Sequence, residues 1–413
     1  MKILYLHQYF KTPQMSGGTR SYEMARRLVL AGHQVTMITA DTSNHHGSGG
    51  WRVSQEAGIE VHWLPVPYSN QMSYPERIRA FVRFAFKSAL RAASIPADVV
   101  FATSTPLTIA IPGIAARLWL RVPMVFEVRD MWPDVPIALG ILRNPILIWL
   151  ARRLELFAYR QAGHVVALAP GMRDDIIAKG VSAGKVSVIP NGCDLDIVSG
   201  HNDDPSPRNE YSWLGERKLV LYAGAIGVAN GVDYLVHLAH KVLQIDSEIR
   251  FVIFGEGREK ESVQRLAVQL GVLERNLFIF NPLSKRKIAR WWVAADMHVA
   301  LMRGPRVYLK DAVNNKFFDA LAAHKPIANN FDGWQSRIAE EGGVGLILNS
   351  QDVCAAARQL VNALEDSGWI SKVPERARLL AEGRFSRDRL ALQLEDILTT
   401  AVKKYRRNGR NIV

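Results

Sequence analysis

Short apolar runs alternate with amphipathic stretches along most of the chain, which is the pattern of a parallel α/β protein. Residues 2–7 form an apolar run of strand length, the stretch TRSYEMARRLVLAGH has helical spacing, and QVTMITA is the next apolar run. A glycine-containing loop follows the first run, so this segment predicts a strand–loop–helix–strand unit and a parallel sheet. Four later runs continue the alternation: ADVVFATS, VPMVFEVRD, HVVALA and VSVIPN.

The alternation is interrupted at residues 199–212, a polar stretch with two prolines that is typical of an interdomain linker. It then restarts with KLVLYAGAIG, IRFVIFGEG, LFIFNPLS and MHVALM, separated by helical stretches. We therefore predict an α/β protein of two Rossmann-like, doubly wound domains, residues 1–200 and 211–385, facing a cleft. Residues 386–413 are expected to form a long amphipathic helix that packs back toward the N-terminal domain. Doubly wound sheets bind ligands at the carboxyl ends of their strands.

Composition narrows the class of protein. The 413 residues are 48% hydrophobic and 22% charged, which indicates a globular chain long enough for two domains. Cys193 and Cys354 lack metal-ligand spacing, so we expect free thiols in a cytoplasmic protein. Arginines interrupt the most apolar stretches, so we expect a protein that is soluble or lies on a membrane. The net charge of +13 favours an anionic partner: nucleic acid, an anionic membrane or a phosphorylated substrate.

Glycine turns follow three of the predicted strands. The stretch SGGTR, which contains Gly17, Gly18 and Arg20, lies between the first strand and the first helix. Paired glycines allow a phosphate or sugar to approach the backbone, and the helix start adds N–H donors. YAGAIGVANG and FGEGREKE place Gly224, Gly227, Gly255 and Gly257 at equivalent positions in the second half. Tight turns without a ligand are the alternative. The second-half turns do not form G-x-G-x-x-G, which disfavours a nicotinamide cofactor.

The stretch DAVNNKFFDALAAHKPI predicts a helix whose start binds an anion. Asn314 or Asn315 can cap the helix, Lys316 lies in its first turn, and Asp319 follows on the same face. A lysine there opposes the helix dipole, and a diphosphate would offset that cost. Asp319 could accept hydrogen bonds from a ribose. The alternative is a surface lysine–aspartate pair.

Charged residues also follow the apolar strand in FEVRDMWPD. We predict that Asp130 is a general base and that Arg129 binds a phosphate or carboxylate, with an internal arginine–aspartate pair as the alternative. In IPNGCDLD, Asp194 and Asp196 form an Asp-x-Asp pair, which is either a divalent-metal site or two acids in a loop between the domains.

Residues 74–93 combine arginines and a lysine with aromatic and aliphatic residues at helical spacing. This composition predicts a helix at an anionic membrane surface. A core helix with a solvated basic face is the alternative. Residues 141–160 are a second candidate of the same kind.

Several of these motifs, in this order, resemble the family 4 glycosyltransferases with the two-domain GT-B fold, and more narrowly the bacterial polysaccharide and O-antigen enzymes that transfer amino sugars. The resemblance covers nearly the whole chain. It depends on GGTRSYEMARRLVLAGHQVTMIT, FEVRDMWPD, VIPNGCD, GAIGVANGVDYLV, FGEGREKE and NNKFFDALAAHKPI.

The resemblance implies retaining sugar transfer from a nucleotide-diphosphate donor, without a metal or other cofactor. It places Arg129 and Asp130 near the reacting centre and Lys316 on the diphosphate. The family's N-G-x-D turn corresponds to Asn191, Gly192 and Asp194, so Asp194 is expected to be structural or cleft-lining. The residues implied to bind the donor are Gly17, Gly18, Arg20, Asn191, Gly224, Gly227, Asn230, Gly255, Gly257, Arg303, Arg306, Asp311 and Asp319.

Two departures from the family pattern change the expected site. The glycine turn AGAIGVANG lacks the arginine and lysine that many relatives carry there, so Lys316 with Arg303 or Arg306 would have to supply the charge. Asp311 and Asp319 stand where the family has a pair of glutamates.

We expect an enzyme on the inner face of the cell membrane that transfers a sugar from a UDP-sugar, for example an N-acetylamino sugar. The expected acceptor is a lipid-linked sugar or a glycan. The alternatives are a sugar-nucleotide epimerase, a non-catalytic membrane scaffold, and a nucleic-acid binder, which the absence of an RNA- or DNA-binding motif disfavours.

Overall fold

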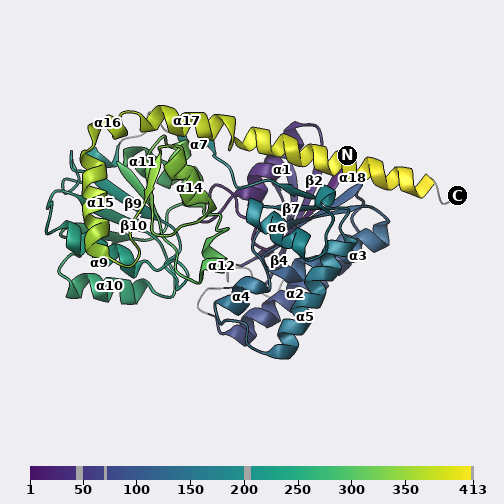
Figure 1. Cartoon of the computed structure of the whole chain (residues 1–413). Coiled ribbons are helices and arrows are strands. Elements are labelled where there is room, and N and C mark those ends of the chain that lie inside the picture. Colours follow the sequence, from purple (N-terminus) through teal and green to yellow (C-terminus); the bar gives the residue numbers. More distant parts are fainter. Residues whose placement is uncertain (43–49, 69–71, 200–205, 411–413) are drawn as a thin grey trace. The chain divides into compact units, whose positions relative to one another are not determined.

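A computed structural model describes the chain except for residues 43–49, 69–71, 200–205 and 411–413 (Figure 1). It divides into two compact units. Unit 1 contains residues 1–12, 19–190 and 388–413, and unit 2 contains residues 13–18 and 191–387.

Unit 1 is built on an eight-stranded sheet with the order β3-β4-β2-β1-β5-β6-β7-β8 (Figure 1). All neighbouring strands are parallel except β3 and β4, which the sequence pattern did not predict. The central strands are buried along their length, as their continuous apolar runs require. The strands are β1 (Lys2–Leu6), β2 (Gln34–Asp41), β3 (Arg52–Glu56), β4 (Ile59–Pro65), β5 (Val99–Thr103), β6 (Met124–Val128), β7 (His164–Ala167) and β8 (Val186–Val188).

The helices of unit 1 include the last helix of the chain, α18 (Arg387–Arg410), apart from its first residue. Arg27 donates to Asp388 at 2.6 Å and His33 lies 2.9 Å from Glu395, so α18 packs on unit 1 through polar contacts. The other helices are α1 (Arg20–Leu30), α2 (Tyr74–Ala93), the 3-10 helix η1 (Leu107–Ile109), α3 (Ala110–Leu120), α4 (Asp134–Ala138), α5 (Pro145–Gln161), α6 (Pro170–Ala178) and the 3-10 helix η2 (Ala183–Lys185).

Unit 2 is built on a six-stranded, fully parallel sheet with the order β11-β10-β9-β12-β13-β14. The strand order reverses between β9 and β12, which is where doubly wound sheets bind ligands at their carboxyl ends. The strands are β9 (Leu219–Ala223), β10 (Arg250–Phe254), β11 (Leu277–Phe280), β12 (Met297–Ala300), β13 (Ile327–Asn329) and β14 (Gly345–Ile347).

The helices of unit 2 cover this sheet with buried apolar faces, and α9 packs directly on α15. They are α7 (Leu195–Ser199), α8 (Pro207–Glu210), α9 (Asp233–Val242), α10 (Lys260–Gln269), α11 (Lys285–Ala294), α12 (Arg306–Leu309), α13 (Asn315–Ala322), α14 (Trp334–Glu341), α15 (Val353–Glu365), α16 (Ser367–Ile370) and α17 (Val373–Gly383).

The predicted linker at 199–212 differs from the structure. The units divide at Pro190, and the described end of the stretch belongs to unit 2, where it forms α8. Arg208 explains this difference, because its guanidinium donates to Asp296 and to the carbonyls of Gly215 and Arg217. These bonds attach α8 to the rest of unit 2. Residues 200–205 lie outside the described residues.

Candidate active site

The start of α13 carries a lysine without a carboxylate partner. The Asn314 side chain caps the helix by accepting from the Lys316 N–H at 3.1 Å. The Lys316 ammonium lies 4.6 Å from the centroid of the Tyr222 ring, at the end of β9. Within the described part of the chain, no carboxylate oxygen comes within 4 Å of this ammonium. The charge is therefore available to an anion at the helix start.

The Lys316 ammonium also lies directly on the first glycine turn of unit 2, which is residues 224–231. A Cβ atom at Gly224 would come within 2.5 Å of Lys316 Nζ, so a glycine is needed for this approach. The Gly224 N–H donates to the Phe254 carbonyl, which removes it from any ligand. The N–H groups of Ala225 and Gly227 have no acceptor among the described residues. These are the amides of the turn that a phosphate could use.

The second glycine turn of unit 2, residues 255–257, packs against the backbone of the first one. A Cβ atom at Gly255 would lie 2.3 Å from the Gly224 carbonyl oxygen, and one at Gly257 would lie 2.3 Å from the Ile226 carbonyl oxygen. Gly257 also has φ +154, which disfavours any other residue. The predicted contact of Gly255 and Gly257 with the donor is not needed to explain these glycines, because backbone packing between the turns already requires them.

Two groups on one face of α13 have shifted pKa values. Burial lowers the pKa of Lys316 from 10.5 to about 8, and the carboxylate of Asp319 only partly offsets this. Burial also raises the pKa of Asp319 from 3.8 to about 6, against the opposing effect of Lys285, whose ammonium is 3.7 Å away. Both charges lie in a poorly hydrated site, where a bound diphosphate would interact strongly with Lys316.

Asp194 is the centre of a buried ion-pair cluster. The side chains of Lys285 and Arg387 both donate to its carboxylate, and all three residues are buried. Burial alone would raise the pKa of Asp194, but the charges of Arg387 and Lys285 hold it well below its usual range. Asp196 is exposed on α7. The two acids of the Asp-x-Asp pair thus lie in different environments, and the charge of Asp194 is already neutralised by Lys285 and Arg387.

A metal site also lacks support elsewhere. In the ranges that the structure describes, no three His, Cys, Asp or Glu side chains are arranged to hold a metal ion.

The turn that begins unit 2 contacts the start of α13. Asn191 donates from Nδ2 to Oδ1 of Asn315 at 2.9 Å, and its own Oδ1 is buried without a partner among the described residues. A Cβ atom at Gly18 would lie 3.1 Å from Nδ2 of Asn315. Gly17, with φ 123, and Gly18 belong to unit 2 by their contacts, although they follow the first strand of unit 1. The structure thus brings Gly18 and Asn191 to the residue beside Lys316.

Arg303 lies against the same glycine turn. Its N–H donates to the Ala229 carbonyl at 2.8 Å, and its side chain covers Gly231, whose φ is +57. Its guanidinium already donates to both carboxylate oxygens of Asp233 at 2.6 Å. The charge of Arg303 is therefore already paired with a carboxylate before a ligand binds.

The remaining donor candidates of unit 2 lie in three different environments. Asn230 closes the glycine turn through its N–H, which donates to Gly227 at 2.8 Å. Arg306 is exposed at the first residue of α12. Asp311 is buried, with the Lys310 ammonium 3.4 Å away.

In unit 1, Asp130 and Arg129 lie after β6, as predicted. Asp130 accepts a hydrogen bond from Thr105 at 2.9 Å, and Arg129 donates to Nε2 of His7 at 3.1 Å. Because a guanidinium cannot accept, His7 must carry its proton on Nδ1, which then donates to Ser21 at 2.7 Å. Burial and the Arg129 and Arg20 charges hold the pKa of His7 well below its usual value. A neutral histidine thus orients Arg129, and no ion pair forms between Arg129 and Asp130.

The prediction that Arg20 binds the donor is wrong. Arg20 is 1% exposed, and its guanidinium donates to Glu127 at 2.7 Å and to the carbonyls of Pro190 and Ile189. These partners occupy its donors, so it stabilises the interior of unit 1. The motif SGGTR suggested a ligand contact because it follows a strand, whereas the buried carboxylate of Glu127, distant in sequence, decides the direction of the side chain.

Sequence reasoning missed His7, Glu127 as a partner, Lys285 and Arg387. His7 gave a weak signal, since it is a polar residue at the carboxyl end of an apolar strand. No local signal linked Lys285 and Arg387 to Asp194, because they lie 91 and 193 positions away from it in the sequence.

Comparison with known proteins agrees with this fold. Residues 17–192 match the glycosyl transferase 4-like domain, and residues 217–366 match the glycosyl transferases group 1 domain. The colanic acid biosynthesis protein WcaI of Escherichia coli, whose name describes it as a glycosyl transferase, is 25% identical over 321 residues, which cover 73% of this chain and 77% of WcaI.

Two solved structures are similar over nearly their whole length. Sucrose-phosphate synthase from Thermosynechococcus elongatus has a TM-score of 0.75 at 16% identity, with coverage of 97% of this chain and 98% of that one. HepE from Anabaena, solved with UDP and glucose, has a TM-score of 0.70 at 17% identity, with coverage of 97% and 100%.

Two parallel-sheet units, one a glycosyl transferase 4-like domain and the other a group 1 domain, define a glycosyltransferase. The chain belongs to the family 4 glycosyltransferases with the GT-B fold.

Proposed function

We propose that this glycosyltransferase is a retaining, metal-independent enzyme of cell-surface polysaccharide synthesis. The observation that carries the proposal is the Lys316 ammonium, which is poorly hydrated, has no carboxylate within 4 Å among the described residues, and lies at a helix start on a glycine turn. This arrangement suits the charge that develops on a leaving diphosphate.

The donor in this proposal is a UDP-sugar bound by unit 2. Lys316 and the amides of Ala225 and Gly227 contact the diphosphate, and Asp319 accepts from the ribose. The UDP bound to HepE supports the choice of base. A thermal-shift screen of UDP-, GDP- and ADP-sugars, with glucose and N-acetylamino sugars on UDP, tests this assignment. Stabilisation by GDP- or ADP-sugars alone would contradict it.

Metal independence is supported by the state of Asp194. Its carboxylate is held by two buried cations, so a divalent ion would have to displace an ammonium and a guanidinium to bind there. We expect transfer to continue in excess chelator at the untreated rate. Loss of transfer that is restored by Mn²⁺ would refute this part of the proposal.

Unit 1 contributes the acceptor side in this proposal. Asp130 orients the acceptor hydroxyl, and the leaving phosphate takes its proton in a front-face transfer that retains the anomeric configuration. We expect Asp130→Asn to lower kcat by about 10², the usual effect of misplacing a reacting group. Wild-type rates in that variant, or an inverted product in NMR spectra, would contradict the assignment. Incubation with the donor alone separates this activity from epimerisation, because an epimerase requires no acceptor.

The acceptor is a lipid-linked sugar or a glycan at the inner face of the cell membrane. The name of WcaI, which refers to colanic acid biosynthesis, supports a polysaccharide pathway. The basic, aromatic helix at residues 74–93 supports peripheral binding to an anionic membrane. In the part of the chain that the structure describes, we find no helix with the length and apolar character to span a bilayer.

A further inference from the structure

Large apolar side chains are exposed on one part of unit 1. Of the twenty large hydrophobic side chains that are exposed in the described chain, ten lie between residues 82 and 157. Trp119 is 77% exposed on α3 and Trp149 is 56% exposed on α5. The others are Val82, Phe86 and Leu90 on α2, Leu118 on α3, Ile141 before α5, and Ile146, Leu150 and Phe157 on α5.

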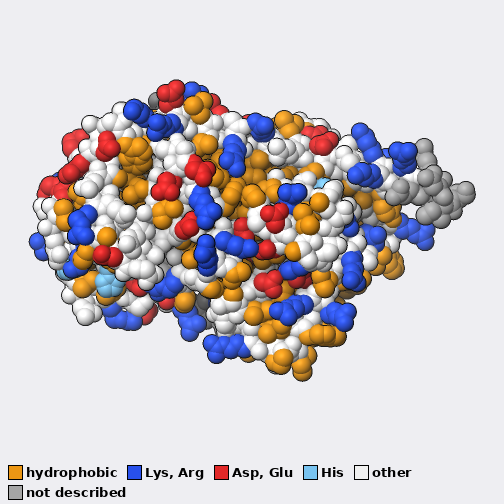
Figure 2. Space-filling model, in the orientation of Figure 1, with side chains coloured by type: hydrophobic (Ala, Val, Ile, Leu, Met, Phe, Trp, Pro, Cys, Tyr) orange, Lys and Arg blue, Asp and Glu red, His pale blue; other side chains and the backbone are white. Residues whose placement is uncertain are grey.

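These residues lie on helices that are neighbours. Helix α3 packs against both α2 and α5, so the exposed side chains belong to one region of unit 1. Figure 2 shows apolar and basic side chains side by side on the surface over α2 and α5, at its lower edge. Part of the apolar stripe predicted at residues 74–93 is interior, since Phe84 is fully buried. The exposed residues of α2 thus form a second face, distinct from its core face.

The charge of this region is almost entirely positive. Exposed basic residues occur on α2, on α5 and in the turns beside α3 and α5: Arg79, Arg83, Lys87, Arg121, Arg143, Arg152, Arg153 and Arg160. Glu76, at the start of α2, is the one exposed acid within the described residues of α2, α3 and α5. Glu155 is buried and pairs with Lys179. An anionic surface would therefore meet little repulsion here.

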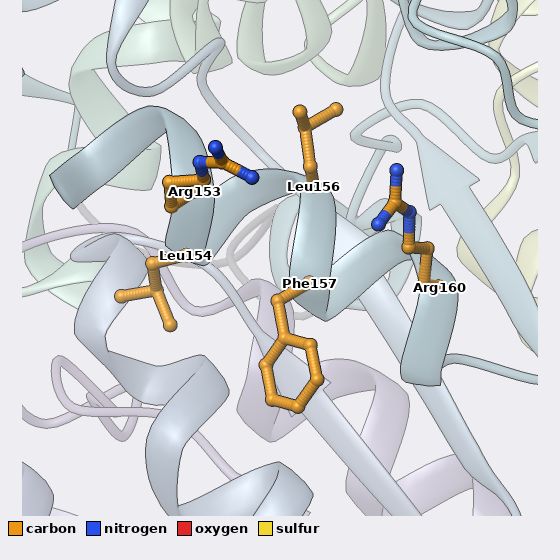
Figure 3. Close-up of a pocket in the computed structure, with 5 residues that line it drawn as sticks. All are labelled: Arg153, Leu154, Leu156, Phe157 and Arg160. Carbon is orange, nitrogen blue, oxygen red and sulfur yellow. The ribbon is translucent and has the colours of Figure 1, made fainter. Parts of the chain in front are cut away.

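Basic and apolar side chains also surround a shallow hollow along α5. It has a volume of about 360 Å³ and is lined by Arg153, Leu154, Leu156, Phe157 and Arg160. Figure 3 shows Arg153, Leu156 and Arg160 extending from one side of the helix, with Leu154 and Phe157 on the other. Two guanidinium groups beside apolar side chains suit lipid phosphates and the start of their acyl chains.

We propose that α2, α3 and α5 together form a membrane-docking surface that lies on a bilayer rich in anionic lipid. Indoles prefer the headgroup region, where the ring is shielded from water and the N–H stays hydrated, so Trp119 and Trp149 anchor the surface. The basic residues interleaved with them bind lipid phosphates. A surface that binds a partner protein usually has an apolar centre with few charged residues. On this surface charged and apolar residues alternate throughout. This inference rests on the membrane partner of the proposed function and enlarges the region that contacts it from one helix to three.

Vesicle flotation tests this surface. The full-length chain is mixed with phosphatidylcholine vesicles, with or without phosphatidylglycerol, at about 0.1 M and about 1 M salt, where the Debye length falls from about 10 Å to about 3 Å. One variant removes the anchors (Trp119→Ala with Trp149→Ala). The other reverses two charges on α2 (Arg83→Glu with Lys87→Glu). We expect binding only to the anionic vesicles, a loss at high salt, and a partition coefficient at least about thirtyfold lower in the charge variant.

Matched controls lie outside the surface. Leu379 and Leu392 are also exposed apolar residues, at 56% and 64%, and Arg286 with Lys287 is an exposed basic pair of unit 2. Leu379→Ala with Leu392→Ala, and Arg286→Glu with Lys287→Glu, are expected to bind vesicles like the wild type. Circular dichroism spectra and thermal melting like those of the wild type show that each variant is folded. UDP titration by calorimetry tests the proposed function separately.

Three results would overturn the proposal. They are no binding to anionic vesicles at low salt, equal binding by the wild type and both surface variants, and a wild-type dimer that the tryptophan variant converts to a monomer without vesicle binding. The last result would assign the face to a second copy of the chain. Vesicle binding without UDP binding would refute the proposed function and leave this surface standing.

Discussion

Replacing Lys316 with methionine is expected to stabilise unit 2 and to inactivate the enzyme. Methionine has nearly the same length and can pack on the Tyr222 ring and on Gly224. It removes an ammonium that is half-buried and poorly hydrated in the free protein. The variant thus separates the cost of holding this charge from its use in the reaction.

The size of the effect on stability follows from the pKa of Lys316. A decrease from 10.5 to about 8 means that the charged form is destabilised by about 3 kcal/mol at neutral pH, at about 1.4 kcal/mol per unit. Methionine forfeits the cation–π contact with Tyr222, worth about 1 kcal/mol. The free energy of unfolding should therefore rise by about 2 kcal/mol, and Tm by about 5 °C, when no ligand is present.

The effect on activity has the opposite sign. Loss of one preorganised donor on the leaving group typically raises the barrier by about 3–4 kcal/mol, so we expect kcat to fall by 10²–10³. Calorimetric melting without ligand and initial rates with saturating donor measure the two effects. The control Lys287→Met changes an exposed lysine and should alter neither. A variant that melts below the wild type, or that transfers at the wild-type rate, would show that Lys316 is a structural residue.

Further predictions concern pH and the buried pairs of unit 2. The affinity for UDP, measured by calorimetry, should fall above pH 8 by up to tenfold per pH unit, because UDP favours the protonated form of Lys316. In Lys316→Arg the affinity should not change over this pH range. An affinity that falls with pH in that variant would exclude Lys316 as the source of the pH dependence. Asp194→Asn should destabilise unit 2 by about 3–5 kcal/mol in denaturant unfolding, because two buried cations lose their counter-charge, whereas Asp196→Asn should change it by less than about 0.5 kcal/mol. Gly257→Ala should cost at least about 2 kcal/mol, and unchanged stability would mean that the two glycine turns can separate.

Most of the fold could be predicted because its signal is local. Strands buried on both faces require continuous apolar runs, and β1, β5, β6 and β10 show them directly in the sequence. The hairpin of β3 and β4 has no such signal, since β3 is mostly polar and lies at the edge of the sheet. The linker was misplaced for a related reason. Composition identified a polar segment but could not show that Arg208 binds it to unit 2.

The candidate site also contains some residues whose role could be predicted from local sequence and others whose role could not. A cap at Asn314 or Asn315 and a charge at Lys316 were predicted from a helix start, where both are decided within a few residues. The structure shows that Asn314 is the cap. Arg20 and Asp194 depended on partners 107 and 193 positions away, Glu127 and Arg387. Sequence pattern places a charged residue at the end of a strand or the start of a helix, but the partner decides whether that charge is neutralised or available.

This distinction bears on the arginine and lysine that many relatives carry in the first glycine turn of unit 2 and that this chain lacks. Arg303 lies beside the turn, but Asp233 already accepts two hydrogen bonds from it. Lys316 lies on the turn with no carboxylate within 4 Å in the described structure, and burial has already moved its pKa toward neutrality. A charge that is poorly solvated before binding gains more from a diphosphate than one that is already paired. We therefore expect donor binding in this chain to depend more on Lys316 than on Arg303.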